Sequence, residues 1–375
     1  MTESNQERWM RRALGLAERG AGAVSPNPLV GCVIAGADGE VIGEGWHGEY
    51  GGPHAEVWAI HDAERRHGAG ALRDSTLVVT LEPCSHHGKT PPCADLILEK
   101  QIPRVVVGMR DPFPKVDGSG IERLRAHDVD VTVGVLEEEC ERLNEAFVHH
   151  VRTGRPLVTL KIAQTLDGSV ATASGDSRWV SGEGARRLVH RWRAELDGVL
   201  VGSGTARVDD PALTVRHVDG RQPVRVVLDR AGALPPDLRL FSDEHVPQTI
   251  AVVGEEAHPA YAEAFVGRGG VVLRVPERDG HLDLGALLDR LGAGVGPHRP
   301  LQSLLVEAGP GLATALLRAD LVDRFALFIA PKLVGGRRAV DNLFIERMVD
   351  ARTFEECRWE SVGPDMLFVG TRRAV

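Results

Sequence analysis

Three residue types that can bind a metal stand at characteristic spacings in the first hundred residues. His54-Ala55-Glu56 comes first, Cys84 follows a proline, and Cys93 follows after an eight-residue insert. Structural zinc sites are usually closed by four protein ligands, whereas catalytic sites keep one position open for water. One imidazole, two thiolates and a spare carboxylate are therefore an inventory for metal-activated hydrolysis.

In this order the residues are typical of a zinc deaminase, which removes an amino group from a heterocycle. Zinc lowers the pKa of a bound water molecule to roughly 7, so that hydroxide is available at neutral pH. Glu56 would take the water proton and deliver it to a ring nitrogen, a shuttle worth about 10²–10⁴-fold in rate. We therefore expect His54, Cys84 and Cys93 to bind zinc and Glu56 to be catalytic.

Local signals place these residues at the starts of helices. Gly51-Gly52-Pro53 ends a loop, and proline is favoured at the first helical position, so we expect a helix over 54–67. Cys93 likewise follows two prolines at the start of an apolar stretch. The positive end of a helix dipole favours thiolate over thiol, which suits a metal ligand.

Other interpretations of these residues stay open. A lone His-x-Glu occurs often by chance, and two cysteines can simply be buried. A structural zinc site would take a fourth ligand, which His86, His87 or another cysteine could supply. The joint order of a helix start, a strand at 76–81, Glu-Pro-Cys and a second helix start favours the catalytic interpretation.

Length and composition bound the remaining possibilities. A chain of 375 residues is too long for one ordinary core and predicts two domains. No apolar run approaches membrane-spanning length, and a net charge of −9 argues against a broad nucleic-acid surface. The other three cysteines are too scattered for a disulfide framework. Together with a start that lacks an apolar signal region, they predict a cytoplasmic protein.

The fold class we expect is α/β in both domains, residues 1–152 and 153–375. The first domain reads as a small α/β sandwich with a mixed sheet. Its strands are expected at 30–34, 41–46, 76–81, 104–108 and 129–135. A helical stretch at 136–152 ends at the linker Thr153-Gly154-Arg155-Pro156. In the second domain strands alternate with helices, at 157–163, 198–201, 224–228, 250–253, 271–275, 303–306 and 324–329.

The second half contains two glycine-rich turns between a strand and a helix, at 200–205 and 304–311. Backbone amides at such a helix start can cradle a phosphate. Neither turn matches the full Gly-x-Gly-x-x-Gly pattern, and isolated glycine pairs are more often plain turns. From the residues alone, a nucleotide site and an ordinary turn both remain open.

Several longer motifs resemble a known family, the bifunctional riboflavin-biosynthesis deaminase–reductase. In the first half they are SPNPLVGC at 25–32, GWH at 45–47, GGPHAE at 51–56 and LEPCSHHGKTPPC at 81–93. In the second half they are TLK at 159–161, LDG at 166–168, SG at 181–182, VGSGT at 201–205 and DPALTVR at 210–216. The eight-residue gap between the cysteines is the discriminating detail, because cytidine and tRNA-adenosine deaminases usually space theirs by two.

The resemblance implies two consecutive reactions. A cytidine-deaminase-like N-terminal α/β/α sandwich would use zinc to hydrolyse the 2-amino group of 2,5-diamino-6-ribosylamino-4(3H)-pyrimidinone 5′-phosphate. A C-terminal dihydrofolate-reductase-like domain would then use NADPH to reduce the ribosyl side chain, giving 5-amino-6-ribitylamino-uracil 5′-phosphate. The partners implied are this small phosphorylated pyrimidine, no nucleic acid, no membrane, and further copies of the chain in a homo-oligomer.

The resemblance also assigns individual residues. Asn27 would orient the pyrimidine. The NADPH positions are Ala163, Trp179, Thr205, Asp209 and Gly309, and the substrate positions are Ser177, Arg193, Leu213, Arg216 and Glu307. Arginines suit a ribosyl phosphate because the guanidinium fork matches its oxygens. Lys161 would lie beside the nicotinamide or pair with a carboxylate, and Arg186, Arg187 and Arg191 are expected on a solvated helix face.

Two positions depart from the family pattern. Gln164-Thr165 stands where Ala-Ser is common, and Arg230 follows Asp229 where a small hydroxyl residue is common. Arg230 would either contact the cofactor's ribose phosphate and so favour NADPH over NADH, or lie on an exposed turn.

Three rival functions come from other classes. One is a nucleic-acid-editing deaminase, against which the acidic balance and the long cysteine gap count. Another is a zinc-stabilised binding module without catalysis. In the third, only the deaminase half is active and the second half is a scaffold.

Overall fold

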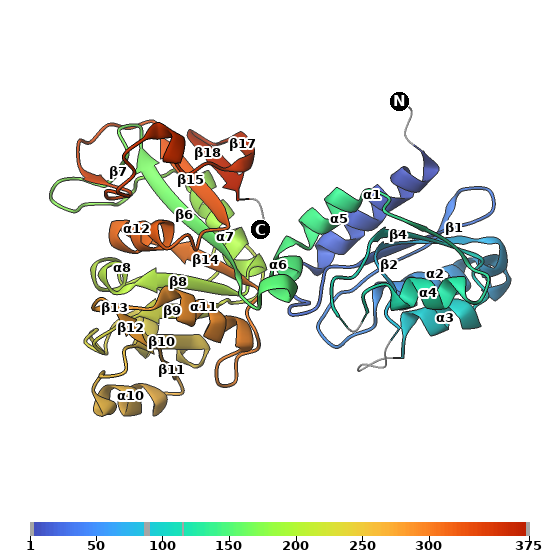
Figure 1. Ribbon diagram of the computed structural model, residues 1–375, viewed down its shortest axis with the longest axis horizontal. Helices are drawn as coiled ribbons and strands as arrows, with labels where there is room; N and C mark the ends of the chain where they lie inside the picture. The colour runs from blue at the N-terminus through green and yellow to red at the C-terminus, as the bar shows by residue number, and fades with distance from the viewer. Residues whose placement is uncertain (1–3, 86–90, 115, 373–375) are drawn as a thin grey trace. The chain divides into compact units, whose positions relative to one another are not determined.

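The chain folds into two compact units, Met1–Thr153 and Gly154–Val375. The computed structural model describes residues 4–85, 91–114 and 116–372 (Figure 1). Gly154, at the boundary, has a φ of +73°, a conformation that glycine adopts without steric cost. Both units are α/β, as the alternation of strand and helix patterns predicted.

The first unit is built on one five-stranded sheet with the order β2-β1-β3-β4-β5. Strand β1 is antiparallel to both β2 and β3, whereas β3, β4 and β5 are parallel, so the sheet is mixed as expected. Its strands are β1 (Gly31–Ala35), β2 (Val41–Trp46), β3 (Thr76–Leu81), β4 (Arg104–Met109) and β5 (Asp130–Val133). Its helices are α1 (Asn5–Ala17), α2 (Ala55–His67), α3 (Cys93–Glu99), α4 (Ser119–Arg125), α5 (Glu137–Leu143) and α6 (Glu145–Thr153).

Helices cover both faces of this sheet (Figure 1). On one face, Met10 of α1 and Cys140 of α5 pack with Val33, Val78 and Val106 of the strands. On the other face, apolar side chains of α2, α3 and α4 pack with the alternate residues of the same strands. Because successive side chains of a strand point to opposite faces, strands buried on both sides read as continuous apolar runs. The arrangement is a three-layer α/β/α sandwich.

Two glycines let α2 lie directly on β2. A Cβ atom added to Gly43 would stand 2.4 Å from the carbonyl oxygen of Ala59. One added to Gly45 would stand 2.4 Å from the carbonyl oxygen of Ala55, in the first turn of the helix. The start of α2 is therefore held against the sheet by backbone contact.

The second unit contains a nine-stranded sheet with the order β11-β10-β9-β8-β14-β6-β15-β18-β17. Its strands are β6 (Leu157–Thr165), β8 (Gly198–Gly202), β9 (Val224–Leu228), β10 (Thr249–Val253), β11 (Val271–Arg274), β14 (Ser303–Glu307), β15 (Arg324–Ala330), β17 (Glu355–Val362) and β18 (Asp365–Thr371). Short pairs are formed by β12 (Glu277–Arg278) with β13 (His281–Leu282) and by β7 (Ser169–Ala171) with β16 (Arg337–Arg338). The helices are α7 (Glu183–Glu195), α8 (Ser203–Asp209), α9 (Arg239–Ser242), α10 (Pro259–Val266), α11 (Leu284–Ala293) and α12 (Pro310–Arg318).

The strands from β11 to β15 are parallel, and the hairpin of β17 and β18 extends the sheet in the antiparallel sense. Strand β14 lies between β8 and β6, so the strand order reverses there. In open α/β sheets, ligands bind beyond the carboxyl ends of the strands at such a reversal. The fold therefore predicts a ligand site at the carboxyl ends of β6, β8 and β14.

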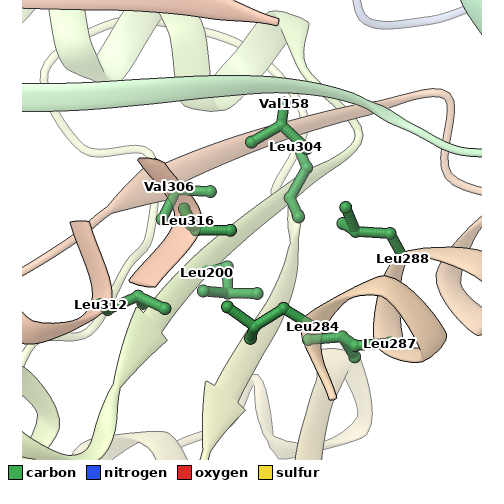
Figure 2. A pocket seen from close by; sticks show the side chains of 9 residues that line it. All are labelled: Val158, Leu200, Leu284, Leu287, Leu288, Leu304, Val306, Leu312 and Leu316. Atoms are coloured by element: carbon green, nitrogen blue, oxygen red, sulfur yellow. The ribbon is translucent and has the colours of Figure 1, made fainter. Parts of the chain in front are cut away.

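The core on one face of this sheet contains a small void (Figure 2). Its volume is about 10 Å³, and its lining is entirely aliphatic. The lining residues come from three strands, β6, β8 and β14, and from α11 and α12: Val158, Leu200, Leu284, Leu287, Leu288, Leu304, Val306, Leu312 and Leu316. A dry void of this size is a packing defect and offers nothing to a polar ligand.

The strands expected in the second half all form, with small shifts at their ends. The strands β17 and β18 and the short strands β7, β12, β13 and β16 are additional to them. Within the described residues, no helix combines the length and the apolarity needed to cross a membrane.

Candidate active site

The three metal-binding side chains expected from the sequence converge in the first unit. His54 is the N-cap of α2, Cys84 lies in the loop after β3, and Cys93 is the first residue of α3. The Nδ1 atom of His54 lies 3.2 Å from the Sγ atom of Cys93 and 3.6 Å from that of Cys84. All three ligand atoms lie within 4.8 Å of one another. A loop, a strand end and two helix starts thus bring together residues that are far apart in the sequence.

This donor set fits a zinc ion. Zinc–sulfur and zinc–nitrogen bonds of about 2.3 and 2.0 Å in tetrahedral geometry place ligand atoms roughly 3.5–3.8 Å apart. The observed separations are close to this spacing. In the parts of the chain that the structure describes, the group has these three members. His86 and His87, the alternative fourth ligands, lie outside the described residues.

The three ligand side chains shift one another's pKa values. A hydrogen bond from the Cys93 thiol, with further support from His54, holds the pKa of Cys84 well below its usual range. The resulting thiolate raises the pKa of His54 to about 9. The backbone N–H of Cys93 also donates to Cys84 Sγ, at 3.3 Å. The hydrogen bond to Cys84 and burial raise the pKa of the Cys93 thiol well above its usual range. Metal binding needs a neutral imidazole and thiolates, so it would release the protons of His54 and Cys93.

Glu56 stands beside these ligands without being one of them. Its side chain is 3 % exposed, and burial raises the pKa of its carboxyl group, an effect that His54 partly opposes. A carboxyl group with a raised pKa is suited to exchanging protons near neutral pH. The structure thus places Glu56 where the sequence-based prediction needs it.

Asn27 belongs to a short hydrogen-bonded chain that ends at the loop before His54. Its Nδ2 donates to Nε2 of His47 at 3.0 Å, and Nδ1 of His47 lies 3.1 Å from the carbonyl oxygen of Pro53. Because that oxygen only accepts, His47 carries its proton on Nδ1 and accepts at Nε2. The chain fixes the orientation of the Asn27 amide. His47 was noted in the sequence only as part of a motif, without a role.

Glu82 is a buried carboxylate that the sequence analysis did not single out. It is 3 % exposed and accepts four backbone N–H groups. Oε1 accepts from Gly120 at 2.9 Å and Ile121 at 3.3 Å, and Oε2 accepts from Gly118 at 2.9 Å and Asp111 at 3.2 Å. Since Glu82 lies two residues before Cys84, these bonds tie the metal-binding loop to the start of α4. Its place before Pro83-Cys84 was the available signal.

In the second unit a buried ionic cluster lies at the carboxyl end of β14. Nε of Arg193, on α7, donates to Oε1 of Glu307 at 2.6 Å. Lys161 of β6 is the register neighbour of Glu307 on the adjacent strand. Burial alone would raise the pKa of Glu307, but Arg193 and Lys161 hold it below its usual range. Burial lowers the pKa of Lys161, although Glu307 opposes this. Lys161 therefore has a carboxylate neighbour, one of its two expected roles.

The loop between α8 and β9 brings two more expected substrate residues to this cluster. Nη1 of Arg193 donates to the carbonyl oxygen of Thr214 at 3.1 Å. Leu213 is buried with a φ of +53°, and Arg216 is exposed. Nη1 of Arg216 donates to Oγ1 of Thr214 at 2.8 Å. Leu213, Arg216, Arg193 and Glu307 thus come together around one loop.

The expected cofactor residues include two helix starts that lie side by side. A Cβ atom added to Gly309, the N-cap of α12, would stand 3.2 Å from Oγ1 of Thr205 in α8. A Cβ added to Gly204 or Gly311 would meet nothing within 4 Å, so the backbone is open there. Ala163 lies on β6, which pairs with β14. Open amides at adjacent helix starts fit the phosphates of a dinucleotide.

The remaining expected residues lie in the loop between β7 and α7 and at the end of α8. Trp179 is 64 % exposed, and the guanidinium of Arg186 lies 4.7 Å from the centroid of its ring. The carbonyl oxygen of Asp209 accepts from Arg178 at 3.0 Å, which links the end of α8 to the loop that holds Trp179. Ser177 lies in the same loop, two residues before Trp179, and is half-buried.

The two departures from the family pattern occupy different surroundings. Arg230 is exposed and pairs with Glu277, with Nη1 and Oε2 3.0 Å apart, so the exposed-turn interpretation fits. Gln164 is half-buried on β6 beside Ile329 of β15.

Comparisons with known proteins match both halves of the chain. The family described as "RibD C-terminal domain" matches residues 156–368, and "Cytidine and deoxycytidylate deaminase zinc-binding region" matches residues 3–109. The riboflavin biosynthesis protein RibD of Escherichia coli is 42% identical, over 96% of this chain and 97% of its own. That of Aquifex aeolicus is 38% identical, over 98% of each chain.

Solved structures agree over the whole chain. RibD of Acinetobacter baumannii has a TM-score of 0.85 at 34% identity, covering 99% of both chains. A Thermotoga maritima protein has a TM-score of 0.84 at 38% identity, covering 98% of this chain and 99% of its own. It is described as a diaminohydroxyphosphoribosylaminopyrimidine deaminase/5-amino-6-(5-phosphoribosylamino)uracil reductase.

Proposed function

Because the chain belongs to the RibD family of bifunctional deaminase–reductases in riboflavin biosynthesis, we propose a specific substrate and specific residues for each of its two reactions. The first unit is a zinc-dependent deaminase of cytidine-deaminase-like fold, and the second is an NADPH-dependent reductase of dihydrofolate-reductase-like fold. The first unit would hydrolyse the 2-amino group of 2,5-diamino-6-ribosylamino-4(3H)-pyrimidinone 5′-phosphate. The second would reduce the ribosyl side chain of that product to ribityl.

The observation that carries the deaminase assignment is the convergence of His54, Cys84 and Cys93 beside the buried Glu56. Zinc, when bound by the three ligands, acts as a Lewis acid that makes hydrolysis possible at neutral pH. The Glu56 carboxylate accepts one proton from the attacking water and donates it to a ring nitrogen. It then takes the proton of the newly formed hydroxyl and passes it to the amino group, which departs as ammonia while the carbonyl forms. The amide of Asn27, fixed by His47, orients the pyrimidine ring.

In the reductase, the residues divide into those that hold the cofactor and those that hold the substrate. Thr205 and Gly309 bind the NADPH phosphates at the two adjacent helix starts, and Ala163, Trp179 and Asp209 line the rest of the cofactor site. NADPH, when bound, supplies the two electrons of the reduction. Arg216 and Arg193 hold the ribosyl phosphate, Glu307 hydrogen-bonds the polar groups of the substrate, and Ser177 and Leu213 complete its site.

Glu56→Gln tests the deaminase assignment. The amide keeps the shape of the side chain but cannot shuttle the proton, so we expect deamination to fall by about 10²–10⁴-fold. Zinc content should stay at one ion per chain, and NADPH oxidation with the deaminated substrate should be unchanged. Glu99→Gln, on the exposed surface of α3, makes the same chemical change and should leave both reactions intact.

Each rival predicts a different result in this experiment. A zinc-stabilised binding module would show no turnover and no effect of Glu56→Gln. A scaffold in place of a reductase would leave NADPH unoxidised by the wild-type chain. An editing deaminase would act on a tRNA or on single-stranded DNA in place of the pyrimidine.

We also propose that the chain forms a homo-oligomer and works in the cytoplasm. Between residues 333 and 366 of the second unit, eight large apolar side chains are exposed, which supports association: Leu333, Val334, Phe344, Ile345, Met348, Val349, Trp359 and Met366. All five cysteines are free, which supports a reducing compartment. Light scattering of the purified chain and fractionation of the producing cells test the two proposals separately.

A further inference from the structure

The loop at 210–216 has no regular secondary structure, and side chains from elsewhere hold its backbone. Arg225 donates to the carbonyl oxygen of Ala212 at 3.0 Å. Gln222 bonds both backbone groups of Val215, at 2.7 and 3.1 Å. These hydrogen bonds hold residues that precede Arg216, the last residue of the loop. The orientation of Arg216 therefore depends on a further bond to its own backbone.

His190 makes this hydrogen bond to the backbone of Arg216. Its Nδ1 accepts the backbone N–H of Arg216 at 3.0 Å, and the side chain is 5 % exposed. On α7 it lies three residues before Arg193, on the same face of the helix. Arg193 bonds Thr214 and Glu307, so one helix face holds both the loop and the carboxylate. His190 itself is not among the residues assigned to substrate or cofactor.

The surroundings keep His190 able to accept this bond. Burial first, and then Arg193, His217 and Arg216, together lower its pKa to about 4, against the smaller opposing effect of Glu307. These groups come from its own helix, from the loop and from β14. The ring of His217 packs edge-on against it, with centroids 4.4 Å apart. At neutral pH, His190 is therefore uncharged, and Nδ1 is free to accept.

We propose that His190 is a positioning residue of the reductase, which fixes the backbone at Arg216 and thereby aims the exposed Arg216 guanidinium at the 5′-phosphate of the substrate. This inference rests on the proposed reductase function and on the role proposed there for Arg216. His190 does not contact the substrate and takes no part in the reduction. Its effect should therefore appear in substrate binding and depend on the phosphate.

Two substitutions separate positioning from simple core packing. His190→Leu has a similar volume but no acceptor, whereas His190→Asn retains an acceptor oxygen close to the position of Nδ1. With the deaminated substrate, we expect His190→Leu to raise KM about tenfold, the loss of roughly one hydrogen bond, with kcat changed less than threefold. His190→Asn should restore KM to within about threefold of wild type. KM for NADPH and the deaminase rate should be unchanged in both variants.

The phosphate dependence provides the second readout. Arg216→Met should raise KM for the phosphorylated substrate, and the double variant with His190→Leu should be no worse than Arg216→Met alone, because both remove the same contact. With the dephosphorylated substrate, all three variants should match wild type.

The outcomes distinguish this inference from the function on which it rests. If the wild-type chain does not oxidise NADPH with the deaminated substrate, or if Arg216→Met leaves KM unchanged, the proposed reductase site is wrong. If both behave as proposed while His190→Leu leaves KM unchanged, the inference alone is overturned. It is also overturned if His190→Asn is as impaired as His190→Leu, or if the effect persists with the dephosphorylated substrate.

Discussion

Replacing Glu82 by glutamine should selectively damage the deaminase unit. Each carboxylate oxygen accepts one short and one longer bond from backbone N–H groups, at 2.9 and 3.3 Å for Oε1 and at 2.9 and 3.2 Å for Oε2. In either orientation of the glutamine, its NH₂ group faces two buried N–H donors. An unpaired buried donor costs about 1–3 kcal/mol, with the longer contact at the low end. We therefore expect Glu82→Gln to lower the free energy of unfolding by about 2–5 kcal/mol.

The effect should reach the metal-binding loop. The four donors lie between Asp111 and Ile121, and Oγ of Ser119 in that segment lies 2.6 Å from Oγ of Ser85, the neighbour of Cys84. Loosening the segment should make zinc easier to remove. We expect zinc to be lost at a lower chelator concentration and deamination to fall, while NADPH oxidation with the deaminated substrate is unchanged.

The assay is thermal unfolding of the full chain, combined with chelator competition and with both activities measured on the same preparation. A loss of this size in a unit of about 150 residues shifts the midpoint by the order of 10 °C. Glu122→Gln is the matched control, because Glu122 lies exposed on α4, the helix that contains the Glu82 partners Gly120 and Ile121. If Glu82→Gln unfolds within about 1 kcal/mol of wild type, the four donors have found other partners and the reasoning is refuted.

Three further predictions concern charge and metal. Asp243→Asn should cost the second unit about 3–5 kcal/mol in urea unfolding, because Arg225, 1 % exposed, loses the charge that pairs with it at 2.7 and 2.8 Å; a loss below about 1 kcal/mol would contradict this. Lowering the pH from about 6.5 to about 4 should cost stability because His190, with a pKa lowered to about 4, takes up its proton more readily in the unfolded chain. The stability contributed by neutral His190 is fully present above pH 6.5 and amounts to at most about 3 kcal/mol. His190→Asn should lose this part of the pH dependence, and an unchanged slope of unfolding free energy against pH would refute the prediction. Removing zinc with a chelator should abolish deamination but leave NADPH oxidation with the deaminated substrate within about twofold, and a parallel loss of both would show that the reductase also needs the metal.

The metal site was predictable because every ligand carries a local signal. Proline and glycine mark the helix start at His54, and proline precedes both cysteines. The long apolar strands were predictable for a similar reason, since burial on both faces leaves a continuous apolar run.

Glu82 could not be predicted in the same way. Its partners Gly118 and Gly120 lie 36 and 38 residues away and contribute only backbone N–H groups, which leave no trace in side-chain type. Arg193 and Glu307 were assigned to the substrate site by the family resemblance alone, and their ion pair, which spans 114 residues, was not predicted.

Strand β17 was missed for a different physical reason. It is exposed along nearly all its length, and four of its eight residues are charged. It is a strand because its backbone pairs with β18 at the edge of the sheet, an interaction that does not depend on burial.

The glycines of β2 have a consequence for the metal ligands. Helix α2 and strand β2 are in direct backbone contact at these glycines. No flexible side chains lie between them that could adjust to a change in their spacing. A methyl group at Gly45 would act as a rigid spacer under the first turn of α2 and lift the end that carries His54. Restoring an ordinary contact from 2.4 Å requires a displacement of roughly 1 Å, several times the ±0.2 Å that a metal–ligand distance tolerates. Gly45, which contacts neither metal nor substrate, thus sets the distance between His54 and the sulfur atoms of Cys84 and Cys93.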